Sequence, residues 1–199
     1  MRRRIALLNM PDHVDPRASE NLGLGYLISV LQDAGHQVVN VDVVPKTLRN
    51  LMESGLGGDF DLVGMSPFQG TSELAFKIAE RVKYLNPRTH ICVGGVFASF
   101  NAADILRDLI NSLGRTGGFE PVGGIGYRTG NGEVAFTPPA PVKDLDTVGF
   151  PDRKAFVRLA AEFGPEWVHA RVAGARGCAR HCSFCAIPSF GRGQGVPAW

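Results

Sequence analysis

Three cysteines late in the sequence are the residues whose spacing most clearly predicts chemistry. Cys178, Cys182 and Cys185 are four and three positions apart, so one loop can bring all three thiols to a single metal centre. Thiolates are ligands of iron–sulfur clusters and of zinc, and the spacing alone leaves both open. Three protein ligands leave one coordination position for a substrate or another exogenous ligand, which is typical of catalytic metal sites.

Other residues near this cluster, and the remaining cysteine, fit less specific roles. His181 could be a fourth ligand, but because it directly precedes Cys182 we do not expect it to reach the same metal. Arg176 and Arg180 would favour thiolates electrostatically, and both also fit as solvated side chains. Cys92 lies in an apolar run and is expected to be a free thiol that packs as a small apolar residue.

Composition and charge restrict the class of protein. Hydrophobic residues make up 44% and charged residues 20% of the 199, which excludes a disordered tail and predicts a folded chain. The 21 basic and 19 acidic residues give a net charge of +2, so neither nucleic acid nor a membrane surface is favoured as a partner. No stretch approaches the ~20 apolar residues of a membrane span, and the clustered thiols are unlike a secreted disulfide framework. We therefore expect a cytoplasmic protein.

The first hundred residues alternate short apolar runs with amphipathic segments. Strands are expected at 5–9, 37–44, 61–66 and 90–94, and helices at 22–34, 48–52 and 74–85. Apolar strands joined by helices imply right-handed crossovers and a parallel sheet that is covered on both faces. The expected fold class is therefore α/β, with a doubly wound parallel sheet.

Ligands of such sheets bind at the carboxyl ends of the strands, so the informative loops are those at 9–21, 66–71 and 94–100. Ser66 and Thr71 place hydroxyls at both ends of a turn that also contains Pro67. Gly94 and Gly95 would let a bulky ligand approach the backbone, since neither has a Cβ. Alternatively, the glycines only turn the chain and the hydroxyls only cap the next helix. These five residues are the candidate ligand-binding residues of the sheet.

The sequence after the fourth strand departs from a parallel sheet. A helical pattern through 102–113 is followed by two alternating runs on either side of Asn131-Gly132, which predict a hairpin with a two-residue turn. A proline-rich, extended segment comes next. We expect an α/β domain at residues 1–137, a linker at 138–152 and a second unit at 153–199, which begins with a helix.

The motifs together resemble one known family. Cys-x3-Cys-x2-Cys, with Phe184 before the last cysteine and Arg176-Gly177 before the first, is similar to the cluster loop of radical S-adenosylmethionine enzymes. The N-terminal half resembles the cobalamin-binding domain of one subgroup, through Leu22-Gly-Leu-Gly-Tyr-Leu27 and Asp61-Leu-Val-Gly-Met-Ser66. The resemblance implies a flavodoxin-like or Rossmann-like cobalamin-binding domain, followed by the start of an incomplete (β/α) barrel.

The resemblance also implies cofactors and a reaction. The three cysteines would hold a [4Fe-4S] cluster whose fourth iron binds S-adenosylmethionine, with Phe184 beside the nucleoside. An electron donor would start cleavage of the sulfonium to a 5'-deoxyadenosyl radical, and cobalamin would take part in methyl transfer to carbon. No catalytic residue beyond the cluster ligands is implied. The alternative is a non-catalytic corrinoid- or nucleotide-binding module whose cysteines hold zinc or nothing.

Three features differ from the family pattern. The sequence given ends at Trp199, so we expect an N-terminal portion with little or no turnover of its own. The family's fifth strand and acidic loop are not recognisable around 108–119, which predicts a shortened corrin pocket. Asp12-His13 is only part of the motif that donates histidine to cobalt in some corrinoid proteins, so we expect His13 to be solvated. His36 is expected to be a cap or turn residue.

Overall fold

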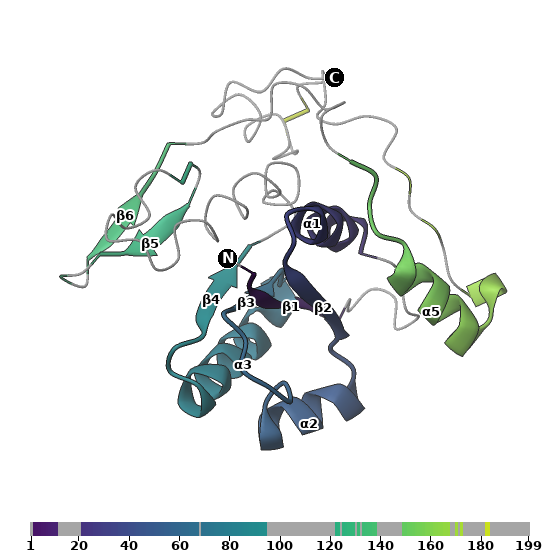
Figure 1. The fold of residues 1–199 in the computed structure, drawn as a ribbon, viewed down its shortest axis with the longest axis horizontal. Helices are drawn as coiled ribbons and strands as arrows, with labels where there is room; N and C mark the ends of the chain where they lie inside the picture. Colours follow the sequence, from purple (N-terminus) through teal and green to yellow (C-terminus); the bar gives the residue numbers. More distant parts are fainter. Residues whose placement is uncertain are drawn as a thin grey trace.

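A computed structural model describes residues 2–11, 21–67, 69–94, 122–123, 125–129, 131, 133–138, 149–167, 170, 172 and 182–183 of the chain. Its main feature is a parallel sheet of four strands with helices on both faces (Figure 1). The strands are β1 (Arg4–Asn9), β2 (Gln37–Asp42), β3 (Leu62–Met65) and β4 (His90–Val93), in the spatial order β2-β1-β3-β4. The predicted α/β class and parallel sheet are confirmed.

The helices between the strands begin and end where local sequence signals place them. They are α1 (Leu22–Asp33), α2 (Pro45–Ser54) and α3 (Ser72–Leu85), the last preceded by the 3₁₀ turn η1 (Gln69–Thr71). The Asn21 side chain caps α1 by accepting a hydrogen bond from the Leu24 N–H at 3.2 Å. Pro45 lies in the first turn of α2, and Gly35 follows α1 with a φ of +85°, which favours glycine.

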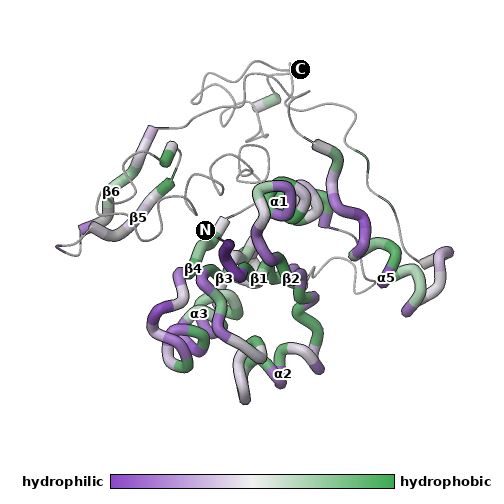
Figure 2. The backbone as a smooth tube through the Cα atoms, viewed as in Figure 1, coloured by the Kyte–Doolittle hydropathy of each residue, from purple (hydrophilic) through white to green (hydrophobic). Residues whose placement is uncertain are grey.

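The central strand β1 is buried on both faces, and its side chains alternate between two hydrophobic clusters. Ile5 and Leu7 pack with α1, whereas Ala6 and Leu8 pack with α2 and α3 on the opposite face. Figure 1 shows this three-layer arrangement, and Figure 2 shows hydrophobic and hydrophilic residues alternating along the helices that cover the strands. The sheet is therefore a rigid layer whose carboxyl ends lie at one edge.

The predicted hairpin is confirmed, but its turn is longer than the predicted two residues. Strands β5 (Gly126–Arg128) and β6 (Val134–Phe136) pair antiparallel, and the last paired residues are Arg128 and Val134. The Thr129 N–H donates to the Glu133 carbonyl at 2.8 Å, and the Thr129 hydroxyl donates to the same carbonyl at 3.1 Å. These bonds close the loop outside Asn131-Gly132, so that dipeptide alone does not set the turn.

The described residues resume at Gly149 and include the helix predicted at the start of the second unit. This helix is α5 (Lys154–Phe163); it ends at Gly164, which has a φ of +94°, and the 3₁₀ turn η3 (Pro165–Trp167) follows. The predicted helix at 102–113, the segment expected to lack the fifth strand, and most of the linker lie outside the described residues. Among the helices that the structure describes, none is both long and apolar enough to cross a membrane.

A polar cluster joins the amino ends of the strands. Asp61 accepts hydrogen bonds from the Arg3 guanidinium at 2.9 Å and from the Arg4 N–H at 2.8 Å. Burial raises the pKa of Asp61, but these hydrogen bonds outweigh burial and hold the pKa below its usual value. The His36 Nδ1 accepts from the Arg3 N–H at 3.3 Å, and the His36 N–H donates to the Leu31 carbonyl after α1, as predicted for a turn residue.

This cluster predicts that the chain loses stability in acid. Burial and nearby positive charge lower the pKa of His36 below its usual value of 6.5, so as the pH falls the unfolded chain binds a proton on His36 before the folded chain does. The contribution of this residue to stability is therefore complete above pH 6.5 and is lost as the pH falls through the lower folded pKa.

Urea unfolding at about pH 7.5 and about pH 5.5 measures this loss. We expect the free energy of unfolding to decrease less between the two pH values in His36→Gln than in the unchanged chain. An equal decrease in both proteins would show that His36 does not contribute.

Candidate functional site

Four of the five candidate ligand-binding residues lie at the carboxyl edge of the sheet. Ser66 and Pro67 directly follow β3, and Gly94 directly follows β4. The Gly94 N–H donates to the Met65 carbonyl at 2.8 Å, which holds the ends of these two strands next to each other. Thr71 is 1% exposed and occupies the N-cap position of α3. The fifth residue, Gly95, lies outside the described residues.

The geometry of this edge leaves groups available to a ligand. Ser66 is partly buried, and its hydroxyl has no hydrogen-bond partner within the described part of the chain. Gly94, on the adjacent strand end, has no side chain to block the approach of a flat or bulky group. The start of α3 lies in the same connection and directs backbone N–H groups toward this edge. The edge therefore suits a large ligand with hydrogen-bonding groups around an apolar body.

A second polar group at the same edge was not among the residues singled out from the sequence. Asn9 and Asp42 are the last residues of β1 and β2, and the Asn9 Nδ2 donates to the Asp42 Oδ1 at 2.9 Å. The Asn21 Nδ2 donates to the Asn9 Oδ1 at 3.3 Å, and Arg158 of α5 forms an ion pair with Asp42. The available signal was that Asn9 and Asp42 each end an apolar strand with a polar side chain.

The predicted metal ligands are only partly visible. Cys182 is described and exposed, whereas Cys178, Cys185, Phe184, His181 and both flanking arginines lie outside the described residues, as does His13. Within the described ranges, no three or more His, Cys, Asp or Glu side chains come together as a metal site. Because the described ranges include only one of the three clustered cysteines, the metal centre stays a prediction.

Cys92 has the environment of a packing residue rather than a ligand. It lies in β4 and packs against the cluster that contains Ile5, Leu7 and Leu62. Burial raises the pKa of the Cys92 thiol to about 11, so this cysteine is protonated at neutral pH. A protonated, partly buried thiol is a poor nucleophile and a poor metal ligand, in agreement with the role predicted for it.

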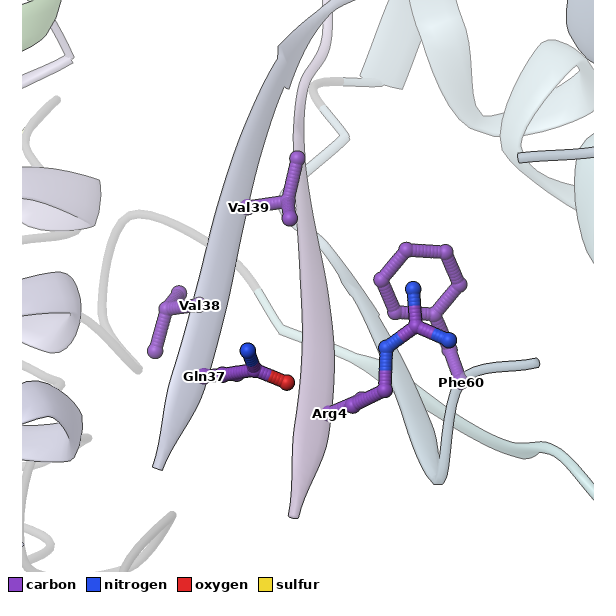
Figure 3. A pocket seen from close by; sticks show the side chains of 5 residues that line it. All are labelled: Arg4, Gln37, Val38, Val39 and Phe60. Atoms are coloured by element: carbon purple, nitrogen blue, oxygen red, sulfur yellow. The ribbon is translucent and has the colours of Figure 1, made fainter. Parts of the chain in front are cut away.

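A pocket of about 190 Å³ lies at the other edge of the sheet (Figure 3). Arg4 and Gln37, the first residues of β1 and β2, line it with Val38, Val39 and Phe60. The Arg4 guanidinium lies over the Phe60 ring, 5.0 Å from its centroid. Since this pocket is at the amino ends of the strands, it is separate from the edge that holds Ser66 and Gly94.

Comparison with protein families finds one match in the N-terminal half of the chain. Residues 17–113, just under half of the chain, match the family model described as B12 binding domain. This part of the chain is therefore similar to B12 binding domains. The matched residues include the five candidate ligand-binding residues, Ser66, Pro67, Thr71, Gly94 and Gly95, and the strands β2, β3 and β4.

Three known proteins are similar to most of this chain. Cytidylyl-2-hydroxyethylphosphonate methyltransferase from Streptomyces wedmorensis is 22% identical over 244 residues, which cover 89% of this chain and 46% of that protein. The cobalamin-dependent S-adenosylmethionine radical enzyme OxsB, solved with aqua-cobalamin bound, has a TM-score of 0.72 and 23% identity; the match covers 92% of this chain and 28% of OxsB.

A further solved structure is the radical S-adenosylmethionine methyltransferase TsrM from Kitasatospora setae, with cobalamin and a [4Fe-4S] cluster bound. Its TM-score is 0.57 at 18% identity, with 94% of this chain and 42% of TsrM covered. At these identities the two structural likenesses show the fold. The chain spans less than half the length of each of these three proteins. Together with the B12 binding domain, they confirm the predicted resemblance to the N-terminal portion of cobalamin-dependent radical S-adenosylmethionine enzymes.

Proposed function

We propose that this chain is the N-terminal part of a cobalamin-dependent radical S-adenosylmethionine enzyme and binds cobalamin at the carboxyl edge of its sheet. The observation that carries the proposal is the placement of Ser66 and Gly94 side by side at the ends of β3 and β4, within the residues that match the B12 binding domain. This is the edge at which open α/β sheets bind their ligands.

The residues at this edge fit cobalamin. A corrin is a broad ring with amide groups at its periphery, so it needs open backbone beneath it and hydrogen-bond partners around it. Gly94 and Gly95 would provide the open backbone, and the Ser66 hydroxyl would hydrogen-bond a peripheral group, with Pro67 and Thr71 shaping the turn. Bound cobalamin would supply a carrier of methyl groups.

The same proposal assigns a cluster to the C-terminal loop. Cys178, Cys182 and Cys185 would hold a [4Fe-4S] cluster, and Phe184 would lie beside S-adenosylmethionine. The spacing of the cysteines and the exposure of Cys182 support this assignment. With an electron donor, the cluster would supply the 5'-deoxyadenosyl radical, and methyl transfer to a carbon is the reaction class we propose. We place this chemistry in the cytoplasm, where clustered thiols stay reduced.

Cobalamin binding is the experiment that tests this function most directly. The chain, purified without oxygen, is incubated with aqua-cobalamin, separated from free cofactor by gel filtration and analysed for cobalt. We expect about one cobalt per chain, as for a single site at the carboxyl edge of an open α/β sheet. Cobalt absent from the protein fraction would overturn the proposed binding, and zinc in place of iron at the cysteines would favour the non-catalytic module.

Ser66→Ala is expected to weaken cobalamin binding without unfolding the chain. Loss of one hydrogen bond of about 0.5–1.5 kcal/mol corresponds to a roughly two- to tenfold higher Kd. Titration followed by the absorbance of cobalamin measures the change. Ser54→Ala is the matched control, because Ser54 bonds only within α2, to the Asn50 carbonyl at 3.0 Å. Equal Kd values for the two variants would contradict the assigned role of Ser66.

A further inference from the structure

The segment that leads toward the cysteine loop is held against the B12 binding domain by specific contacts. Residues 149–152 lie along α1: the Asp152 N–H donates to the Gly25 carbonyl at 2.9 Å, and a Cβ built on Gly149 would be 4.0 Å from the Ser29 Oγ. Gly25 and Ser29 are one helical turn apart and therefore share a face of α1. Gly149 and Asp152 contact this face in the opposite direction, so the segment is antiparallel to the helix.

Gly25 makes this close approach possible. A Cβ at this position would be 2.8 Å from the Asp152 carbonyl oxygen and 3.1 Å from the Pro151 Cβ. Glycine inside a helix is unfavourable relative to alanine, so its presence in α1 needs a local reason. The contact with Pro151 and Asp152 supplies that reason, since any larger residue would push the segment away.

Asp152 connects the segment at residues 149–152 to α5. Its N–H bonds to α1, while its Oδ1 accepts from the Lys154 N–H at 2.8 Å, in the first turn of α5. The position of α5 is therefore tied to the position of the segment on α1.

A second contact fixes the other side of α5. Arg158 pairs with Asp42, the last residue of β2, across 116 residues of sequence. Asp42 is oriented by the Asn9 amide at 2.9 Å, and Asn9 in turn accepts from Asn21, the N-cap of α1. Arg158 is 47% exposed, and an isolated ion pair at such a position contributes little to stability. Here the Asp42 carboxylate is already oriented by Asn9 and Asn21. The start of α5 is also held in place, because Asp152 bonds to the Gly25 carbonyl.

We propose that Gly25, Asp42, Asp152 and Arg158 form a fixed junction, named here the α1–α5 junction, which positions the start of the second unit at the carboxyl edge of the sheet. The linker predicted from composition would let the two parts move independently. The α1–α5 junction instead makes residues 149–163 a part of the B12 binding domain surface. Arg158, Asp42 and Gly25 are positioning residues in this proposal.

The purpose of such a junction follows from the proposed function, on which this step rests. If cobalamin lies at Ser66 and Gly94 and a cluster lies at the cysteines, the two cofactors must be kept at a defined separation. Arg158 lies 20 residues before Cys178 in the chain, and Asp42 ends a strand at the same edge as Ser66. The junction thus anchors the chain shortly before the cluster loop to the edge that would hold the corrin.

Hydrogen exchange of the full chain, without cofactors, tests the junction separately from the function. In the unchanged chain we expect the Asp152 amide to exchange at least about tenfold more slowly than in an unfolded peptide, because it is bonded to Gly25. In Arg158→Met and in Gly25→Ala, we expect faster exchange confined to residues 149–163, with the amides of β1 and β3 unchanged. A protein with a free linker would show fast exchange of Asp152 before any substitution, and that result would overturn the junction.

Two controls keep the result interpretable. Lys77→Met breaks the Glu73–Lys77 ion pair within α3, which joins no two segments, and should leave the exchange of residues 149–163 unchanged. Arg158→Lys keeps the positive charge and leaves the Asn9–Asp42 hydrogen bond in place, so it should retain part of the protection that is lost in Arg158→Met. Exchange in Arg158→Lys as fast as in Arg158→Met would show that charge pairing does not hold α5. Cobalamin binding is measured separately from hydrogen exchange. The α1–α5 junction and the proposed function can therefore each fail without the other.

Discussion

Replacing Cys178, Cys182 or Cys185 by alanine is expected to remove the iron from the anaerobically reconstituted chain. The unchanged chain should hold about four irons and four sulfides, because a [4Fe-4S] cluster with three protein thiolates matches the three clustered cysteines. Each substitution leaves two thiolates, so two of the four irons have no protein ligand instead of one. We therefore expect the cluster to be lost and the iron content to fall below about one per chain. Iron and sulfide analysis, with the visible absorbance of the cluster, measures the change.

Cys92→Ala is the matched control for this experiment. Cys92 is the fourth cysteine of the chain, but its raised pKa and its packing against β1 residues keep it from acting as a thiolate ligand. Iron should therefore remain at about four per chain in this variant. About one zinc and no stable iron in the unchanged chain would contradict the radical-enzyme proposal and support a zinc-binding module. Iron that survives all three cluster substitutions would show that the ligands lie elsewhere.

The sheet could be predicted from sequence because its signals are local. Leu7 and Leu8 belong to an apolar run buried on both faces, and such runs between helices indicate a parallel sheet. Asn21 and Gly35 mark the two ends of α1 through side-chain capping and a positive φ, which depend only on neighbouring residues. From the parallel order, the placement of Ser66 and Gly94 at one edge follows.

The parts that escaped prediction depend on contacts between distant residues. The pairing of Asp42 with Arg158 spans 116 residues, and no pattern within either segment indicates the other. The two glycines of Leu22-Gly-Leu-Gly-Tyr-Leu27 carry a resemblance to a family motif in the sequence. The structure shows that glycine is needed at position 25 because Pro151 and Asp152 pack directly against α1 there. Similarly, the hairpin loop is closed by hydrogen bonds from Thr129 to Glu133, so it is longer than the two-residue Asn-Gly turn that the sequence predicts.

Stability is expected to depend most strongly on the face of β1 that packs against α2 and α3. Leu8 is 0% exposed and lies in the cluster with Val63, Met65 and Ile78, so Leu8→Ala removes three buried carbon atoms from the middle of the molecule. The lost burial and the cavity left behind cost about 2–5 kcal/mol. Since domains of this kind are stabilised by about 5–15 kcal/mol, this single change removes a large part of the total.

Leu85→Ala separates the effect of burial from the effect of the substitution itself. Leu85 ends α3 and is 43% exposed, so the same chemical change there should cost less than about 1 kcal/mol. Urea unfolding followed by circular dichroism measures both variants, and the unfolding slope should be unchanged in each. Because Leu8 directly precedes Asn9 at the carboxyl end of β1, we expect Leu8→Ala to weaken the α1–α5 junction as well. A cost for Leu8→Ala no larger than that for Leu85→Ala would mean that β1 is not the packed centre of the sheet.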